Sequence, residues 1–267
     1  ENTTSGEWIQ RNRSKKRLIA SGYEAGWDIY LTIEALNKKL STKLPAPYHL
    51  IGLSLGGSDA IFASYFDSIL KTNLIKSIMA WSSPSNRYEG FKNFFNLDGL
   101  LGKYKQILLN KIYNMGYETF LSTNTKNPYD VLNESKSPKL ILEKVYLHNS
   151  CNYFNKNRHH FLKEGRHPKK IHLQRNQNID NIKNFLSIFS LDHYLQKINQ
   201  PILCIHSLDD PVINYRRVYN DIVNKQHLKK ISLLSLEYGG HIGFPLAYSK
   251  NWVTEIISKY VNYYHDS

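Results

Sequence analysis

One stretch of the sequence decides the fold of this chain: Tyr48-His49-Leu50-Ile51-Gly52-Leu53-Ser54-Leu55-Gly56-Gly57-Ser58-Asp59-Ala60-Ile61. An apolar run over residues 48–53 meets the motif Gly-x-Ser-x-Gly, and apolar residues then recur at helical spacing. The pattern predicts a buried strand, a sharp turn with Ser54 at its apex, and a helix that runs to about Lys71. A turn of this kind pushes the serine hydroxyl out of the sheet and is called a nucleophile elbow.

We expect the positions on either side of the Ser54 turn to be glycine for a steric reason. We expect a Cβ atom at Gly52 or Gly56 to collide with the neighbouring strand or helix. The main-chain N–H of Leu55 opens the next helix, and we expect it to donate to a developing oxyanion. A serine nucleophile also needs a base, and the base needs an orienting acid. The alternative interpretation is a Gly-rich turn in which Ser54 is a bystander.

Strands alternate with helices along the rest of the chain. We predict further apolar strands at about 74–81, 201–206 and 231–236, and further helices at about 27–40, 215–224 and 252–263. Strands that are apolar throughout are typical of a parallel sheet with both faces covered. The predicted fold class is therefore α/β, a mostly parallel sheet with crossover helices.

The pattern changes between residues 85 and 199, where Lys, Asn, Tyr and His are abundant. We interpret this segment as a helical cap inserted into a core made of residues 1–84 and 200–267. Within the cap, Arg158-His159-His160 raises the question of a metal site. Adjacent histidines point in different directions, and no carboxylate or cysteine partner has ligand spacing. The sequence therefore predicts no metal and no other cofactor.

Catalytic residue types follow three of the predicted strands. Ser54 follows the first, Asp209 and Asp210 follow the strand at 201–206, and His241 follows the strand at 231–236. The carboxyl ends of parallel strands gather at one edge of a sheet, so we expect these side chains to meet there. Taken singly, the aspartates could cap the next helix and His241 could be an ordinary loop histidine. The chain order Ser, Asp, His is that of the α/β-hydrolase triad.

Three segments of the sequence, 52–57, 206–212 and 239–244, resemble the α/β-hydrolase superfamily. The Asp-Asp-Pro and Gly-Gly-His-x-Gly-Phe segments resemble in particular its YheT-like esterase branch. The segment 21–28 is similar to the helix entry that precedes the elbow in that branch. The resemblance spans about residues 20–265 and is weak through the cap.

The resemblance implies a role for each candidate residue. Ser54 is the nucleophile, Asp210 the acid and His241 the base. Asp210 is preferred because the family pattern places the acid directly before the Pro-Val turn, and Asp209 stays open as the alternative acid. The implied function is a serine hydrolase, of carboxylesterase or lipase type, that cleaves small-molecule acyl esters or lipids through an acyl-enzyme. Two alternatives also stay open: acyl transfer to an alcohol by the same triad, and an inactive truncated domain that binds a partner or an acyl ligand.

The front of the chain departs from the superfamily pattern. That fold normally has about four strands before the elbow, and their loops supply a second oxyanion donor, often through a His-Gly motif. Here about 47 residues precede the first predicted strand, and no His-Gly motif occurs among them. The resemblance therefore implies an N-terminal truncation, an open edge at the strand 48–53, and Leu55 N–H as the only clear oxyanion donor.

The composition limits which binding partners and which cellular compartment we expect for this protein. The net charge is +13, but the charges are scattered, and neither zinc spacing nor an RNA-binding aromatic motif occurs, so we expect no nucleic-acid partner. The sequence has no run of about 18 apolar residues, so we predict no membrane span. The positive charge is compatible with peripheral contact with an anionic lipid surface. The sequence has two cysteines, Cys151 and Cys204. They form no disulfide framework, so the simplest prediction is a reducing, cytoplasmic compartment.

Overall fold

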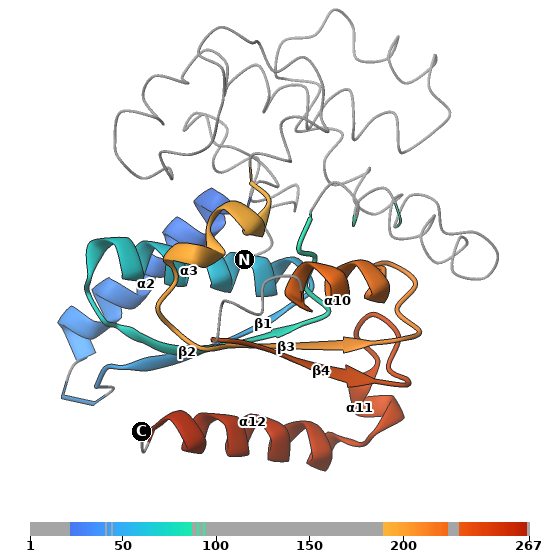
Figure 1. Cartoon of the computed structure of the whole chain (residues 1–267). Coiled ribbons are helices and arrows are strands. Elements are labelled where there is room, and N and C mark those ends of the chain that lie inside the picture. Colours follow the sequence, from blue (N-terminus) through green and yellow to red (C-terminus); the bar gives the residue numbers. More distant parts are fainter. Residues whose placement is uncertain are drawn as a thin grey trace, which may run out of the picture.

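A parallel sheet lies at the centre of the protein, seen here in a computed structural model (Figure 1). The structure describes residues 22–40, 42–43, 45–86, 90, 93, 189–223 and 230–265. The elements in these ranges are α2 (Tyr23–Leu40), β1 (Tyr48–Leu53), α3 (Leu55–Leu70), β2 (Ile75–Trp81), the 3-10 turns η3 (Leu191–His193) and η4 (Leu195–Lys197), β3 (Ile202–Ser207), α10 (Tyr215–Val223), β4 (Ile231–Leu236), α11 (Phe244–Ala247) and α12 (Lys250–His265).

The four described strands form one sheet in the order β1-β2-β3-β4, and every neighbouring pair is parallel. β1 and β4 have the predicted bounds, while β2 and β3 begin one residue later than predicted. Of the described strands, β1 and β4 are the outermost. Two apolar side chains of β1, Ile51 and Leu53, are exposed.

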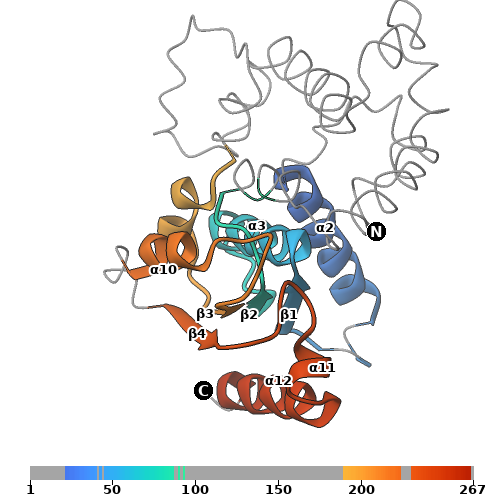
Figure 2. The ribbon, with the colours of Figure 1, turned by 90° about the vertical axis from the view of Figure 1, so that its right-hand side faces the viewer.

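Helices cover both faces of the sheet (Figures 1 and 2). α2, α3 and α10 lie on one face, and α12 lies on the other. β2 shows why the strands are apolar throughout: Ile78 and Ala80 belong to the core on the α3 side, and Met79 and Trp81 to the core on the α12 side. This arrangement confirms the predicted α/β class with a parallel sheet and crossover helices.

Aromatic rings fill the core between the sheet, α2 and α3. The rings of Tyr23 and Phe66 meet edge to face with centroids 4.9 Å apart. The two helices approach closely because Gly26 has no side chain, and a Cβ atom there would lie 2.3 Å from Cβ of Phe62. α2 begins at Tyr23, four residues earlier than the apolar periodicity predicted, because Tyr23 itself is buried in this core.

The predicted cap falls mostly outside the described residues, and so do Arg158-His159-His160 and Cys151. Residues 85, 86, 90 and 93 of it are described, and so is its last part, residues 189–199, which returns to the α3 side of the sheet. Four of its apolar side chains are buried in the same aromatic core, namely Phe189, Leu191, Tyr194 and Ile198. The chain therefore re-enters the core before β3 begins.

α12 closes the opposite face of the sheet. Its residues pack against Met79, Trp81 and Ile205. The Tyr260 hydroxyl also donates to the carbonyl oxygen of Ile78, at 2.8 Å. This helix is longer than the predicted 252–263 by two residues at each end. Within the described ranges, no helix combines the length and the apolar character needed to cross a bilayer.

Candidate active site

Ser54 lies on a strained turn between β1 and α3. Its φ of 53° and ψ of −123° fall in a region that non-glycine residues rarely adopt. The turn is fixed on both sides, because the Ser54 N–H donates to the Trp81 carbonyl at 2.8 Å and the Ser54 carbonyl accepts the Gly57 N–H at 3.0 Å. The sequence pattern of strand, sharp turn and helix is thus present as predicted.

The glycines of this turn differ from our expectation in one respect. A Cβ atom on Gly52 would lie 2.3 Å from the Gly56 carbonyl oxygen, so Gly52 is required as predicted. A Cβ atom on Gly56 would meet nothing within 4 Å, so the predicted collision at Gly56 is wrong. The crowded position is Gly57, where a Cβ atom would lie 2.7 Å from Cβ of Ser83. The error arose because Gly56 points away from the sheet while Gly57 faces the end of β2.

The loop after β4 is held in a tight turn around His241. Gly239 and Gly240 have φ values of +141° and +54°, which favour glycine. The Gly243 N–H donates to the Gly239 carbonyl at 2.7 Å and closes the turn. A Cβ atom on Gly239 would also lie 2.6 Å from the Phe244 ring. His241 is therefore presented from a short, internally bonded loop.

The structure brings Ser54, His241 and Asp210 together in one chain of hydrogen bonds. His241 Nδ1 lies 3.0 Å from Oδ2 and 3.2 Å from Oδ1 of Asp210. His241 Nε2 lies 2.7 Å from Ser54 Oγ. Because a carboxylate can only accept, Nδ1 carries the hydrogen, and Nε2 of the neutral ring accepts from the serine hydroxyl. In this tautomer the ring can take a proton from Ser54.

Asp210 is buried and well satisfied. Its side chain is fully buried, whereas that of His241 is 20% exposed. One carboxylate oxygen also accepts the main-chain N–H groups of Val212 at 2.8 Å and Ile213 at 2.9 Å. Asp210 thus does two things at once: it caps the turn of the Asp-Asp-Pro segment, and it contacts His241. Hydrogen bonds of this number compensate for burying a charged group.

Asp209, the alternative acid, has a different contact. Its Oδ1 accepts the main-chain N–H of Gly240 at 2.8 Å. Ser207, at the end of β3, donates its hydroxyl to the Gly240 carbonyl at 2.5 Å. Both peptide groups of Gly240 are therefore bound from the β3 side, directly before His241. The sequence pattern did not single out Ser207, and its only signal was a polar residue at the end of an apolar strand.

His206 is a second histidine near this site and, unlike His241, it is buried. Its side chain is 1% exposed, and neither ring nitrogen has a hydrogen-bond partner among the described residues. Burial lowers the pKa of His206 to about 4, against the opposing effect of the nearby Asp210. At neutral pH His206 is therefore uncharged and adds no positive charge beside His241.

Leu55, the predicted oxyanion donor, is the first residue of α3. The main-chain N–H groups of a first helical turn point out of the helix, and the helix dipole favours negative charge there. Two exposed apolar side chains flank the site in sequence, Leu53 before the serine and Ile242 after the histidine. The surroundings of Ser54 thus combine a helix N-terminus with apolar surface.

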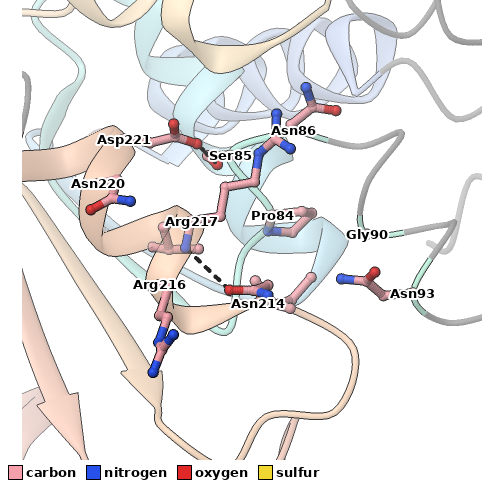
Figure 3. Close-up of a pocket in the computed structure, with 12 residues that line it drawn as sticks. Pro84, Ser85, Asn86, Gly90, Asn93, Asn214, Arg216, Arg217, Asn220 and Asp221 are labelled. Carbon is pink, nitrogen blue, oxygen red and sulfur yellow. Dashed lines mark hydrogen bonds between the residues drawn. The ribbon is translucent and has the colours of Figure 1, made fainter.

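A cavity of about 500 Å³ lies between the chain that follows β2 and α10 (Figure 3). We call it the side cavity; it is bounded by residues 84–86, 90 and 93, residues 213–214 and one side of α10. Ser54, Asp210 and His241 are not among its lining residues, although Ile213, which does line it, donates its N–H to Asp210 at 2.9 Å. No group of three or more metal-ligating side chains occurs in the part of the chain that the structure describes.

Comparisons with known proteins give likenesses of fold. No protein-family model and no curated protein matches this sequence. An esterase from Pyrococcus furiosus is 12% identical with a TM-score of 0.45, over 89% of this chain and 60% of the esterase. Lipase A of Candida antarctica is 16% identical with a TM-score of 0.47, over 88% of this chain and 54% of the lipase.

A lipase-esterase related protein from Clostridium acetobutylicum is 18% identical with a TM-score of 0.38, over 85% of this chain and 72% of that protein. This chain spans about 60% of the length of the Pyrococcus esterase. Because one fold serves many chemistries, a function has to be inferred from the residues of this chain itself.

Proposed function

We propose that the chain is a serine hydrolase of the α/β-hydrolase type that cleaves acyl esters. The observation that carries this proposal is the unbroken contact from Asp210 through His241 to Ser54, with the serine in a strained backbone conformation. Strain of this kind is maintained only where the surrounding structure enforces it, and it clusters at functional sites. Two glycines of this turn, Gly52 and Gly57, lie so close to their neighbours that a Cβ atom at either position would collide.

The proposed reaction has two halves. In the first, Ser54 Oγ attacks the acyl carbonyl carbon while His241 Nε2 takes the hydroxyl proton. The carbonyl oxygen becomes an oxyanion, which we place at the start of α3, where Leu55 N–H is the proposed donor. The bond to the alcohol oxygen then breaks, and His241 returns the proton to that oxygen, leaving an acyl-enzyme on Ser54.

In the second half, water takes the place of the alcohol. His241 removes a proton from the water, the hydroxide oxygen attacks the acyl carbonyl, and the proton passes to Ser54 Oγ as the carboxylic acid leaves. Asp210 stays ionised throughout and stabilises the imidazolium that forms in each half. Its complete burial favours this role, because a charge pair is stronger where water is excluded.

Asp209 has a positioning role in this proposal. A carboxylate already bound to the Gly240 N–H is poorly placed to orient the ring of His241. Together with Ser207, it fixes the peptide groups that precede His241, so it holds the main chain of the base while Asp210 holds its ring. This assigns the two adjacent aspartates separate tasks.

A fluorophosphonate probe tests the proposal directly, because it labels an activated serine irrespective of the natural substrate. We expect the chain to be labelled, and Ser54→Ala to remove the label. Equal labelling of Ser54→Ala and the unchanged chain would exclude Ser54 as the nucleophile. With p-nitrophenyl acetate and an added alcohol, free acid as the sole product would identify hydrolysis, whereas a new ester would identify acyl transfer.

A further inference from the structure

We propose that the carboxyl edge of the sheet docks on a lipid bilayer, so that Ser54 takes its ester directly from the membrane surface. This inference rests on the proposed function and adds the physical state of the substrate, a lipid ester held in a bilayer. It is carried by a group of exposed apolar side chains, which we call the apolar rim. The apolar rim consists of Leu53, Leu208, Tyr238, Ile242 and Leu246.

The rim residues lie next to the candidate catalytic residues. Leu53 directly precedes Ser54, and Ile242 directly follows His241. These two segments meet, because His241 Nε2 lies 2.7 Å from Ser54 Oγ. Leu208 is the first residue after β3 and directly precedes the two aspartates. Each strand end that carries a candidate catalytic residue therefore also carries an exposed apolar side chain.

Leu246 is the most exposed member of the rim, and it projects from a fixed element. It lies on α11, which is located at the carboxyl edge of the sheet on the side of α12 (Figures 1 and 2). Phe244 anchors this short helix, because its buried ring meets the ring of Trp81 with centroids 5.1 Å apart. The Leu246 N–H donates to the Gly243 carbonyl at 2.9 Å, while Leu246 itself is 93% exposed.

The rim differs from the rest of the described surface in its exposure. Its five residues are between 52% and 93% exposed. Among the other large apolar residues that the structure describes, only Tyr263 is comparable, at 71%, and Leu70 follows at 47%. Large apolar side chains that gather in one exposed region mark a surface for binding a protein or a membrane.

The position of Ser54 within the rim favours a membrane over a protein partner. A partner that covered Leu53 and Ile242 permanently would close the serine to substrate. A bilayer covers the rim and presents an ester to the serine in the same encounter. The described loops at this edge carry charges of both signs, such as Glu237 and Lys250, so we expect apolar contact rather than charge to provide the binding.

Two matched pairs of variants separate the rim from exposed apolar surface in general. Leu246→Ser is compared with Leu70→Ser at the last residue of α3, and Tyr238→Ser with Tyr263→Ser near the end of α12. Both helices run back from the carboxyl edge, so the control positions lie at the amino edge of the sheet (Figure 1). All four are made in the Ser54→Ala protein, so that binding is measured without turnover.

Flotation with phosphatidylcholine vesicles measures the binding. About 0.5 M sodium chloride is present, which screens the net charge of +13. We expect the Ser54→Ala protein to float with the vesicles. Leu246→Ser and Tyr238→Ser should each weaken the partition into vesicles by about five- to tenfold, because apolar area buried in the bilayer is lost. Leu70→Ser and Tyr263→Ser should change it by less than about twofold.

A Ser54→Ala protein that does not float, or equal effects at the rim and control positions, would overturn the proposal. Leu246→Gln replaces Leu246→Ser if circular dichroism shows that the serine variant is unfolded. Analytical ultracentrifugation without lipid tests the other occupant, a second copy of the chain. A dimer that Leu246→Ser converts to a monomer would make the rim an interface between copies and would also overturn the proposal.

Failure of this inference is distinguishable from failure of the proposed function. Fluorophosphonate labelling tests the serine in the absence of lipid, whereas flotation uses a protein without that serine. A chain that is labelled but whose Ser54→Ala variant does not float would remain a serine hydrolase without a membrane surface. A chain that floats but is not labelled would keep the membrane surface and lose the proposed reaction.

Discussion

Among the residues that the structure describes, two histidine–serine hydrogen bonds of equal length lie at opposite ends of the sheet. At the carboxyl end, His241 Nε2 lies 2.7 Å from Ser54 Oγ, and at the amino end, His49 Nδ1 lies 2.7 Å from Ser77 Oγ. Only the first pair has a carboxylate behind the histidine, since the other nitrogen of His49 is buried without a partner among the described residues. A hydrogen bond between histidine and serine is therefore common to both pairs and does not by itself identify a reactive serine.

The backbone separates the two pairs as well. Ser54 lies at the apex of a strained turn, whereas Ser77 lies within β2 and is the strand partner of His49, directly after a shift of register between Tyr48 and His49. Ser77 is also fully buried, so no substrate can reach it. The comparison teaches that an acid, a strained turn and access are what distinguish a reactive pair from a structural one.

The largest difference should appear when each serine is replaced. We expect Ser54→Ala to lower kcat for p-nitrophenyl acetate by at least about 10⁴-fold, because the nucleophile is lost. Ser77→Ala should leave kcat within about twofold and only lower stability, by about 1–3 kcal/mol, because His49 loses its partner. Steady-state kinetics with urea unfolding checks both. A Ser77→Ala variant that is folded but inactive would contradict the comparison.

The acid behind His241 is the next feature to remove. Asp210→Asn should lower kcat by about 10⁴-fold with little change in KM, because the imidazolium loses its stabilising charge and the ring its tautomer. Steady-state kinetics measures both constants.

The pair of variants Asp209→Ala and Asp209→Asn tests the neighbouring position. We expect the alanine variant to lose about tenfold in kcat, since a small displacement of the base is costly. The asparagine variant, whose amide oxygen can still accept from Gly240, should retain most activity. If Asp209→Asn were as inactive as Asp210→Asn, the assignment of the acid would be wrong.

The strained turn can be tested separately from the chemistry. Gly52→Ala should lower the free energy of unfolding by about 3 kcal/mol or more, because its Cβ would lie 2.3 Å from a carbonyl oxygen. Gly56→Ala places a Cβ in open space within α3, so it should raise stability by up to about 1 kcal/mol. Chemical denaturation of the two variants gives the sign. A destabilised Gly56→Ala would show that the turn is crowded on the other side.

Acid should weaken the fold through the buried His206 and the half-buried His49. The pKa of His206 is about 4 in the folded protein and 6.5 ordinarily, so the unfolded chain binds more protons between these values. The contribution of the neutral His206 to the free energy of unfolding is therefore complete above about pH 6.5. It falls on acidification, by up to about 2 kcal/mol between pH 6.5 and 5. Burial, followed by the charges of His265 and Lys76, lowers the pKa of His49 and adds to this trend. His206→Leu should show a flatter dependence in urea unfolding at several pH values, and an unchanged slope would contradict this account.

Much of the described core could be predicted from sequence because local pattern determines it. β1 and β4 lie where the apolar runs predicted them, and the carboxyl ends of parallel strands bring Ser54, Asp210 and His241 to one edge. Features that depend on what packs against an element could not be predicted. Which of Gly56 and Gly57 is crowded depends on the direction of the end of β2, and the contact of Asp209 with Gly240 depends on two loops meeting.

The separation of the serine and its base along the chain has a consequence for timing. The two residues that meet at 2.7 Å are 187 positions apart in sequence. At a synthesis rate of about 5–20 residues per second, roughly ten to forty seconds pass between their appearance on the ribosome. During that interval the nascent chain carries Ser54 without a base, so any reactivity of the serine begins only when the loop of His241 has been made and has docked.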